Sequence, residues 1–375
     1  MQLSARVQRI DASGIRRIFD LARSCRDPID LSIGQPDFPI AEPVKAAAIA
    51  AIQGDRNGYT QTQGLAELRA LCLAEERAHT GRSWNDDEIL ITSGVSGGLF
   101  LALLALVEDG SEALIPDPYF VSYLHLVRLF GGTPVLIDTY GSDFLPTPEA
   151  IARAITPRTR VLLLNSPANP TGRIIPEALL REIAAVCTKH GIVIVSDEIY
   201  RAFAYDSAAP SISRYHEETV VLVGHSKSQA MTGWRLGYAC GPRPLIQAMT
   251  KVQQYSFVCA PSLAQYAALA CPAVDRRADI AAYRARRDLM RGLLSPPLRI
   301  APADGAFYLW IEAPAGMTGT AFAERAIAAN CLIIPGSVFS ARDSHVRVCY
   351  TTSTERLRAG AAILLRIAQQ SVVER

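Results

Sequence analysis

The chain has 375 residues, of which 49% are hydrophobic, and a formal net charge of +2. This length provides a large buried core, and the near-neutral charge offers no basic surface for nucleic acid or an anionic membrane. The apolar run LFLALLALV is well short of the roughly 18 residues that span a bilayer. We therefore expect neither nucleic acid nor a membrane as a partner.

The cysteines and histidines restrict the function further. The eight cysteines are scattered without a CxxC pair, which is typical of reduced thiols. The six histidines occur without HxH, HExxH or Cys/His spacing, so no metal site is expected. The N-terminus is charged and amphipathic and lacks the apolar core of a signal peptide. A cytoplasmic location is the expectation.

Three regions are predicted in chain order. Residues 1–30 carry a helical pattern and are expected to pack with a small C-terminal domain. Residues 31–260 form a large domain in which short apolar runs alternate with helical patterns, which indicates an α/β fold with a mostly parallel sheet covered by helices on both faces. Residues 261–375 mix helices with short strands and are predicted to form a smaller α+β domain. The seven predicted strands of the sheet are EILIT, EALIP, TPVLID, RVLLLN, IVIVSD, TVVLVG and LGYACG.

Polar and glycine-rich residues follow several of these strands. In parallel sheets, ligands bind at the carboxyl ends of the strands, so these segments mark the expected site. They are TSGVSGG (92–98), NSPANPTG (165–172), SDEIY (196–200) and GHSK (224–227).

Lys227 is the first candidate for covalent chemistry. The chain holds 38 Lys plus Arg, and only four of them are lysines. Arginine stays protonated, whereas a desolvated lysine amine can lose its proton and act as a nucleophile. The other three lysines lie in amphipathic helical patterns, whereas Lys227 follows the apolar run TVVLVG.

The other motifs each have a structural and a functional interpretation. TSGVSGG is either a tight turn or an anion site at a helix N-terminus, and NSPANPTG is a turn that could hold a cis Asn169–Pro170 bond and aim Asn169 into the cleft. Asp197 at a strand end caps a helix or requires a cation, and Arg347 in an apolar strand requires an anion. Phe120 is either a core residue or a cofactor platform.

Together these residues form the set that pyridoxal phosphate needs. Its aldehyde requires a lysine, its ring nitrogen a carboxylate, and its phosphate cationic and backbone donors. The sequence therefore predicts pyridoxal phosphate as the cofactor, bound through Lys227.

The ordered motifs, from LSIGQPDFP through GYTQTQG, NSPANPTG, VSDEIY and GAFYLWIE to HVRVCYTTS, resemble the class I/II aminotransferases of fold type I, in the aspartate aminotransferase-like bacterial branch. The resemblance implies an enzyme that moves the amino group of an L-amino acid to a 2-oxo acid, with 2-oxoglutarate expected, by a ping-pong mechanism. It also implies a homodimer with shared active sites.

The resemblance also implies a role for each matching residue. Lys227 resembles the Schiff-base lysine, Asp197 the partner of the ring nitrogen, and Tyr200 and Asn169 the donors to the ring's phenolic oxygen. Phe120 matches the ring-stacking aromatic, and Tyr59 the tyrosine that reaches the phosphate of the neighbouring subunit. The clamp on the substrate carboxylate corresponds to Arg347 with the Gly34 backbone and Asn169. The phosphate-cup positions are Gly94, Val95, Ser96, Ser226 and Arg235.

Two departures and two rival functions accompany the resemblance. Gly224 stands where many relatives carry a phosphate-binding serine, and Phe120 replaces tryptophan or tyrosine. A non-catalytic amino-acid sensor would need a DNA-binding domain before residue 31, for which we find no room. A C–S β-lyase on the same scaffold shares Lys227, Asp197 and Arg347, so the motifs do not exclude it. No motif identifies a partner for a distal substrate carboxylate, and Arg16 and Arg17 qualify only if the N-terminal segment folds over the cleft.

Overall fold

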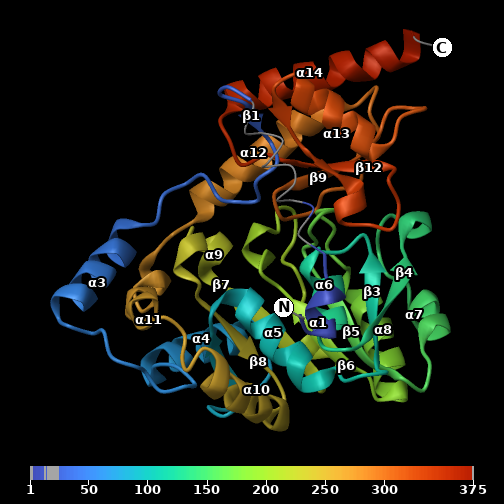
Figure 1. Ribbon diagram of the computed structural model, residues 1–375. Helices are drawn as coiled ribbons and strands as arrows, with labels where there is room; N and C mark the ends of the chain where they lie inside the picture. The colour runs from blue at the N-terminus through green and yellow to red at the C-terminus, as the bar shows by residue number, and fades with distance from the viewer. Residues whose placement is uncertain (1–2, 12–13, 15–24, 374–375) are drawn as a thin grey trace.

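The computed structural model describes residues 3–11, 14 and 25–373 (Figure 1). Of the helical pattern predicted for the first 30 residues, helix α1 (Ala5–Gln8) is described, and it packs against α6 (Ser122–Leu129). Arg16 and Arg17 lie outside the described residues. No helix in the described part of the chain is both long and apolar enough to cross a membrane.

A seven-stranded sheet forms the centre of the larger part of the molecule. All seven predicted strands are present. Six of the apolar runs are mostly buried between helices, whereas TPVLID, at one side of the sheet, is only partly buried. The last predicted strand is antiparallel to both of its neighbours, so a fully parallel arrangement would be wrong and the mostly parallel one is confirmed. In spatial order the strands are β2 (Ile89–Thr92), β8 (Gly237–Cys240), β7 (Thr219–Gly224), β6 (Val193–Asp197), β5 (Thr159–Asn165), β3 (Glu112–Asp117) and β4 (Thr133–Asp138).

Helices cover both faces of this sheet. Successive strand residues point to opposite faces, so Val161 and Leu163 pack in one core, and Leu162 and Leu164 pack in another. The helices over the first face are α5 (Gly94–Leu106), α6 and α10 (Arg243–Ser256). Those over the opposite face are α3 (Glu42–Gln53), α4 (Ala66–Thr80), α7 (Pro148–Ala154), α8 (Glu177–His190) and α11 (Ser262–Ala268). Helices α3 and α11 pack together at one margin of the molecule (Figure 1).

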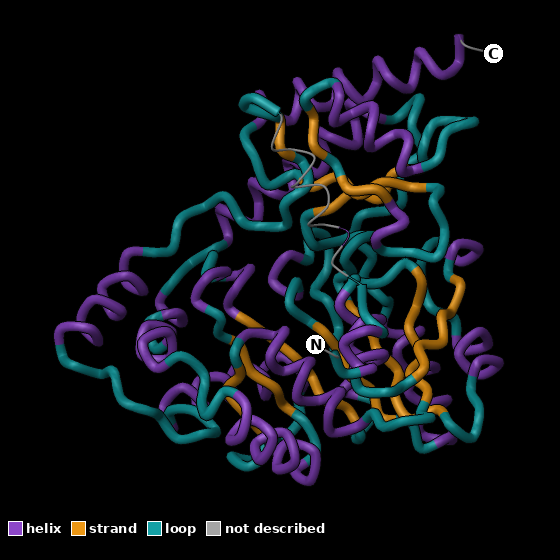
Figure 2. Tube along the Cα trace, in the orientation of Figure 1, coloured by secondary structure: helices purple, strands orange, loops and turns teal. Residues whose placement is uncertain are grey.

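The C-terminal part is smaller and has its own core. A three-stranded antiparallel sheet, in the order β11 (Ile334–Pro335), β12 (His345–Cys349) and β9 (Tyr308–Glu312), packs with three helices (Figure 2). Strand β1 (Ile29–Asp30) runs parallel to β10 (Cys331–Leu332), so chain from the N-terminal side lies beside this part. The three helices are α12 (Arg277–Leu294), α13 (Gly319–Ala328) and α14 (Thr354–Val373).

The division of the chain at residues 30 and 260 stays a prediction. Packing alone groups α11 with the seven-stranded sheet, because Ala264 and Ala267 share a core with Ile89 and Ile91. Leu31, which lies just after β1, and Tyr283 of α12 both pack in the core of the small sheet.

Candidate active site

A cavity of about 320 Å³ opens at the carboxyl ends of the parallel strands, where it also meets β9 and β12. This is the place that the sheet topology predicts for a ligand. Tyr59 and Gly94 are the two predicted site residues that do not line it. The other eleven do: Gly34, Val95, Ser96, Phe120, Asn169, Asp197, Tyr200, Ser226, Lys227, Arg235 and Arg347.

Lys227 is carried by the short helix α9 (His225–Ser228), which directly follows β7. Its Nζ donates a hydrogen bond of 2.7 Å to the carbonyl oxygen of Gly34. The pKa of this amine is lowered to about 8, chiefly by burial, with Arg347 and Arg235 acting in the same direction and Cys349 and Asp197 in the opposite one. The lysine is thus held in the cavity in a setting that makes the nucleophilic neutral amine far more common than in an ordinary lysine.

Asp197 ends β6 with its carboxylate buried beneath the cavity. The sequence left open whether it caps a helix or pairs with a cation; its Oδ2 accepts a hydrogen bond of 2.7 Å from the Tyr123 hydroxyl, and its Oδ1 accepts one of 3.2 Å from the backbone N–H of Ile199. Burial raises the pKa of Asp197 to about 6, against the lowering effect of these two donors and of Lys227. The carboxylate is therefore poised to take a positively charged N–H partner from the cavity.

An anion cup lies at the N-terminus of α5. The Ser93 side chain does not cap this helix, so the first backbone N–H groups are open to a ligand. Gly94 has φ +72°, and a Cβ there would lie 2.6 Å from Nη2 of Arg235, so the guanidinium packs directly against the glycine. Arg235 Nη1 donates to Ser226 Oγ at 3.4 Å and to the Thr232 carbonyl at 3.0 Å. The cup combines helix N–H groups, a hydroxyl and a cation, as a phosphate requires.

Gly224, the predicted departure from the family pattern, is sterically confined. A Cβ at this position would lie 2.9 Å from Cδ1 of Ile199 and 3.0 Å from Cγ2 of Val95. A serine at this position would require small shifts of these two side-chain ends, and in this chain Ser226 with Arg235 supplies the side chains of the cup.

Arg347 lies in β12 with 3% of its surface exposed. It donates to Asn169 Oδ1 at 3.0 Å and to the Ser32 carbonyl at 2.6 Å, and its guanidinium lies 4.6 Å from the centre of the Tyr308 ring. Among the described residues no carboxylate forms an ion pair with it. A buried cation whose partners are neutral is a suitable receptor for a substrate carboxylate.

Two residues that the sequence did not single out complete the site. Tyr123 lies three residues beyond Phe120 in the segment DPYFVSY (117–123), and Tyr308 lies in the motif GAFYLWIE. The Tyr308 hydroxyl is 2.8 Å from that of Tyr200. Both read as ordinary core tyrosines in the sequence, because their partners come from distant parts of the chain. The cis Asn169–Pro170 bond is confirmed, and Asn169 does face the cavity.

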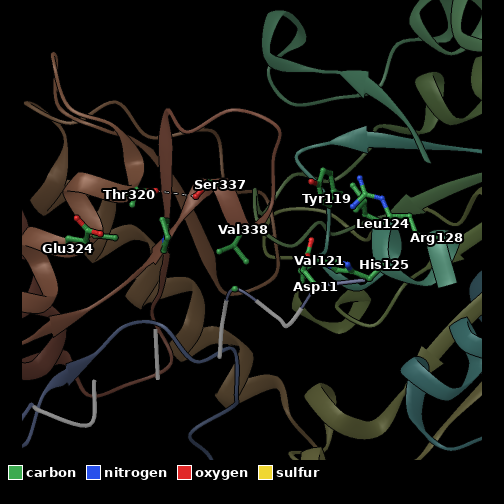
Figure 3. Close-up of a pocket in the computed structure, with 13 residues that line it drawn as sticks. Asp11, Tyr119, Val121, Leu124, His125, Arg128, Thr320, Glu324, Ser337 and Val338 are labelled. Carbon is green, nitrogen blue, oxygen red and sulfur yellow. Dashed lines mark hydrogen bonds between the residues drawn. The ribbon is translucent and has the colours of Figure 1, made fainter. Parts of the chain in front are cut away.

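A second cavity, of about 370 Å³, lies between α6 and α13. In Figure 3, Tyr119 and Arg128 lie on one side, across from Glu324 and Ser337 on the other. None of the predicted site residues lines it. The candidate chemistry is therefore confined to the first cavity.

The donor set of the first cavity fits pyridoxal phosphate. The carboxylate of Asp197, which forms no ion pair within the described part of the chain, suits the protonated ring nitrogen. The open helix end with Arg235 suits the phosphate, and the amine of Lys227 suits the aldehyde. The bound cofactor supplies an electron sink for the carbanion of an amino acid.

Comparisons with known proteins agree with this chemistry. The family "Aminotransferase class I and II" matches residues 26–364. The chain is 37% identical to the aspartate/prephenate aminotransferase of Thermus thermophilus, over 97% of this chain and 98% of that protein, and 34% identical to the aromatic-amino-acid aminotransferase 2 of Thermococcus litoralis, over 95% and 96%. The structure of the Thermus thermophilus aspartate aminotransferase with maleate superposes with a TM-score of 0.93 at 36% identity, over 98% of this chain and 99% of that one. The chain belongs to the class I and II aminotransferases and is a pyridoxal-phosphate-dependent enzyme.

Proposed function

We propose that the first cavity is the catalytic site and that its residues have the roles implied by the family resemblance. Lys227 would bind the aldehyde carbon and Asp197 would keep a proton on the ring nitrogen. Tyr200 and Asn169 would donate to the phenolic oxygen, and Phe120 would cover a face of the ring. The observation that carries this proposal is the Lys227 amine held by Gly34 in a cavity that also contains a buried carboxylate and two arginines. The phosphate would lie among Gly94, Val95, Ser96, Ser226 and Arg235.

The substrate would be oriented by Arg347. Its planar guanidinium can hold the α-carboxylate by two parallel hydrogen bonds, with Asn169 and the Gly34 backbone beside it. This places the substrate Cα–H toward the Lys227 amine, which would remove the proton from Cα and deliver it to the carbon that the cofactor aldehyde supplies. Two charged groups of the site, Asp197 and Arg347, are 5% and 3% exposed, so they are largely shielded from water.

For the substrates, we infer an L-amino acid donor and a 2-oxo acid acceptor, with 2-oxoglutarate the expected acceptor. The relatives differ in the donors that their names state, because one is an aspartate/prephenate and another an aromatic-amino-acid aminotransferase. An amino-acid panel, followed by the loss of the yellow cofactor band, would identify the preferred donor.

The decisive test is product analysis. With a good donor and an acceptor, the enzyme should form keto acid and the new amino acid in equal amounts, without released ammonia or thiol. Lys227→Ala should retain the cofactor and lose turnover. Stoichiometric ammonia or thiol from a donor such as cystathionine would instead identify a β-lyase.

We also propose a homodimer in the cytoplasm in which Tyr59 reaches the cofactor phosphate of the neighbouring subunit. Tyr59 is 86% exposed and lies outside its own cavity, which supports a role toward another chain. The absence of disulfides among the eight cysteines supports a reducing compartment.

Mixed dimers test the sharing of sites. Lys227→Ala and Tyr59→Phe dimers would each be impaired at both sites. In a mixed dimer one site collects both changes and the other is intact, so refolding the two together should restore up to about a quarter of the wild-type activity. No recovery beyond the sum of the two parents would show that Tyr59 serves its own subunit.

A further inference from the structure

Tyr308 connects three parts of the site that lie far apart in the sequence. It begins β9 and is 1% exposed. Its hydroxyl lies 2.8 Å from that of Tyr200, and its ring lies under the guanidinium of Arg347 at 4.6 Å. A Cβ added at Gly34 would fall 2.0 Å from the Tyr308 oxygen, so the bare backbone of Gly34 is what allows this hydroxyl its place.

The number of protons on the two hydroxyls determines which tyrosine donates the hydrogen bond between Tyr200 and Tyr308. A tyrosine hydroxyl has one proton to donate, and either oxygen of the pair can accept from the other. Tyr308 is the only hydrogen-bond partner that the described residues give to the Tyr200 hydroxyl. If Tyr200 uses its proton for the phenolic oxygen of the cofactor, the proton between the two tyrosines must come from Tyr308.

We propose that Tyr308 is a positioning residue that acts through Tyr200: it donates to the Tyr200 oxygen and so turns the Tyr200 proton toward the cofactor. This inference rests on the proposed role of Tyr200. Hydrogen bonds in a chain polarise one another, so the donation from Tyr308 also makes Tyr200 a stronger donor. The contact of the Tyr308 ring with Arg347 links this arrangement to the residue that receives the substrate carboxylate.

The test is a double-mutant cycle with Tyr200→Phe and Tyr308→Phe, in which each change removes one hydroxyl and leaves the ring in place. Two quantities are measured in the holoenzyme: the pyridoxal phosphate dissociation constant and the pH midpoint of the visible cofactor band. Tyr308→Phe should weaken cofactor binding about twofold to tenfold, the usual worth of one hydrogen bond. It should move the midpoint in the same direction as Tyr200→Phe. In the Tyr200→Phe background it should have no further effect on either quantity, because its partner is gone.

The outcomes separate this inference from the proposed function beneath it. If Tyr200→Phe changes neither quantity, the role of Tyr200 itself is wrong. If Tyr200→Phe has an effect and Tyr308→Phe has none, only the positioning role fails. Equal effects of Tyr308→Phe in both backgrounds would mean that Tyr308 acts by packing, which also overturns the proposal. Tyr350→Phe is the matched control, since it removes a buried hydroxyl in the same core whose hydrogen bonds go to Ala306 and Tyr205 and not to Tyr200.

Discussion

The lowered pKa of Lys227 makes a quantitative prediction for the apoenzyme. At pH 7 an amine with a pKa of about 8 is neutral in roughly a tenth of the molecules, whereas an ordinary lysine amine with a pKa near 10.4 is neutral in roughly one of 2,500. The reactive fraction of Lys227 is therefore about 200-fold higher than that of a free lysine at the same pH.

The assay is the rate at which apoenzyme mixed with pyridoxal phosphate becomes yellow, between pH 6 and 10. The rate should rise with pH and level off above about 8. N-α-acetyl-lysine serves as the reference amine, because it reports the pH dependence of the aldehyde itself. A ratio of enzyme to reference rate that stays constant across the range would refute the reasoning.

Charge variants should shift the pH midpoint of the Lys227 reaction in opposite directions. Arg347 lowers the pKa of Lys227 and Asp197 raises it. In the apoenzyme, Arg347→Gln should therefore move the midpoint to higher pH, and Asp197→Asn should move it to lower pH. Shifts in the same direction would show that the variants act through changes in packing rather than through charge.

Three further predictions concern stability and cofactor binding. Apoenzyme Lys227→Met should be more stable than wild type by on the order of 2–3 kcal/mol at pH 7, because the folded wild-type protein must carry a buried cation there. This gain in the free energy of unfolding should fade between pH 8 and 10.5, because the folded lysine is then neutral and the unfolded lysine also loses its proton. Urea unfolding at several pH values measures it, and a gain that persists at pH 10.5 contradicts it. Arg201→Met should cost about 3–5 kcal/mol in urea unfolding, since it leaves Glu76 buried without its cation, while Arg277→Met on the exposed pair with Asp275 should stay within about 0.5 kcal/mol; equal losses would contradict this. Gly94→Ala should weaken pyridoxal phosphate binding more than about tenfold by displacing Arg235, whereas Gly110→Ala, at a similar positive φ with open space around it, tests backbone strain alone and should leave binding unchanged.

The strands could be predicted because burial on both faces leaves continuous apolar runs in the sequence. The direction of a strand leaves no such trace, and the reversed β8 was therefore invisible. The residues that carry the proposed chemistry could be found by type and place, as with Lys227 after β7 and Asp197 at the end of β6.

Their supporting contacts could not be found this way. The hydroxyl of Tyr123 meets Asp197 across 74 residues, and that of Tyr308 meets Tyr200 across 108. A tyrosine inside an apolar helix or strand looks the same in the sequence whether its hydroxyl supports a catalytic group or a loop carbonyl. Only the folded chain distinguishes the two.

The reversal of β8 also determines where this chain tolerates additional residues. Gly224 at the end of β7 pairs with Gly237 at the start of β8, so residues 225–236 leave the sheet and return to it at neighbouring positions, carrying both Lys227 and Arg235. An insertion in this closed excursion would move the amine relative to the guanidinium. At the opposite end of the parallel strands, where β3 begins, the exposed residues 108–110 join α5 to β3 and hold none of the proposed site. The connection at residues 108–110 could therefore carry an inserted tag or domain, whereas the length of the connection at residues 225–236 is fixed by the chemistry of the site.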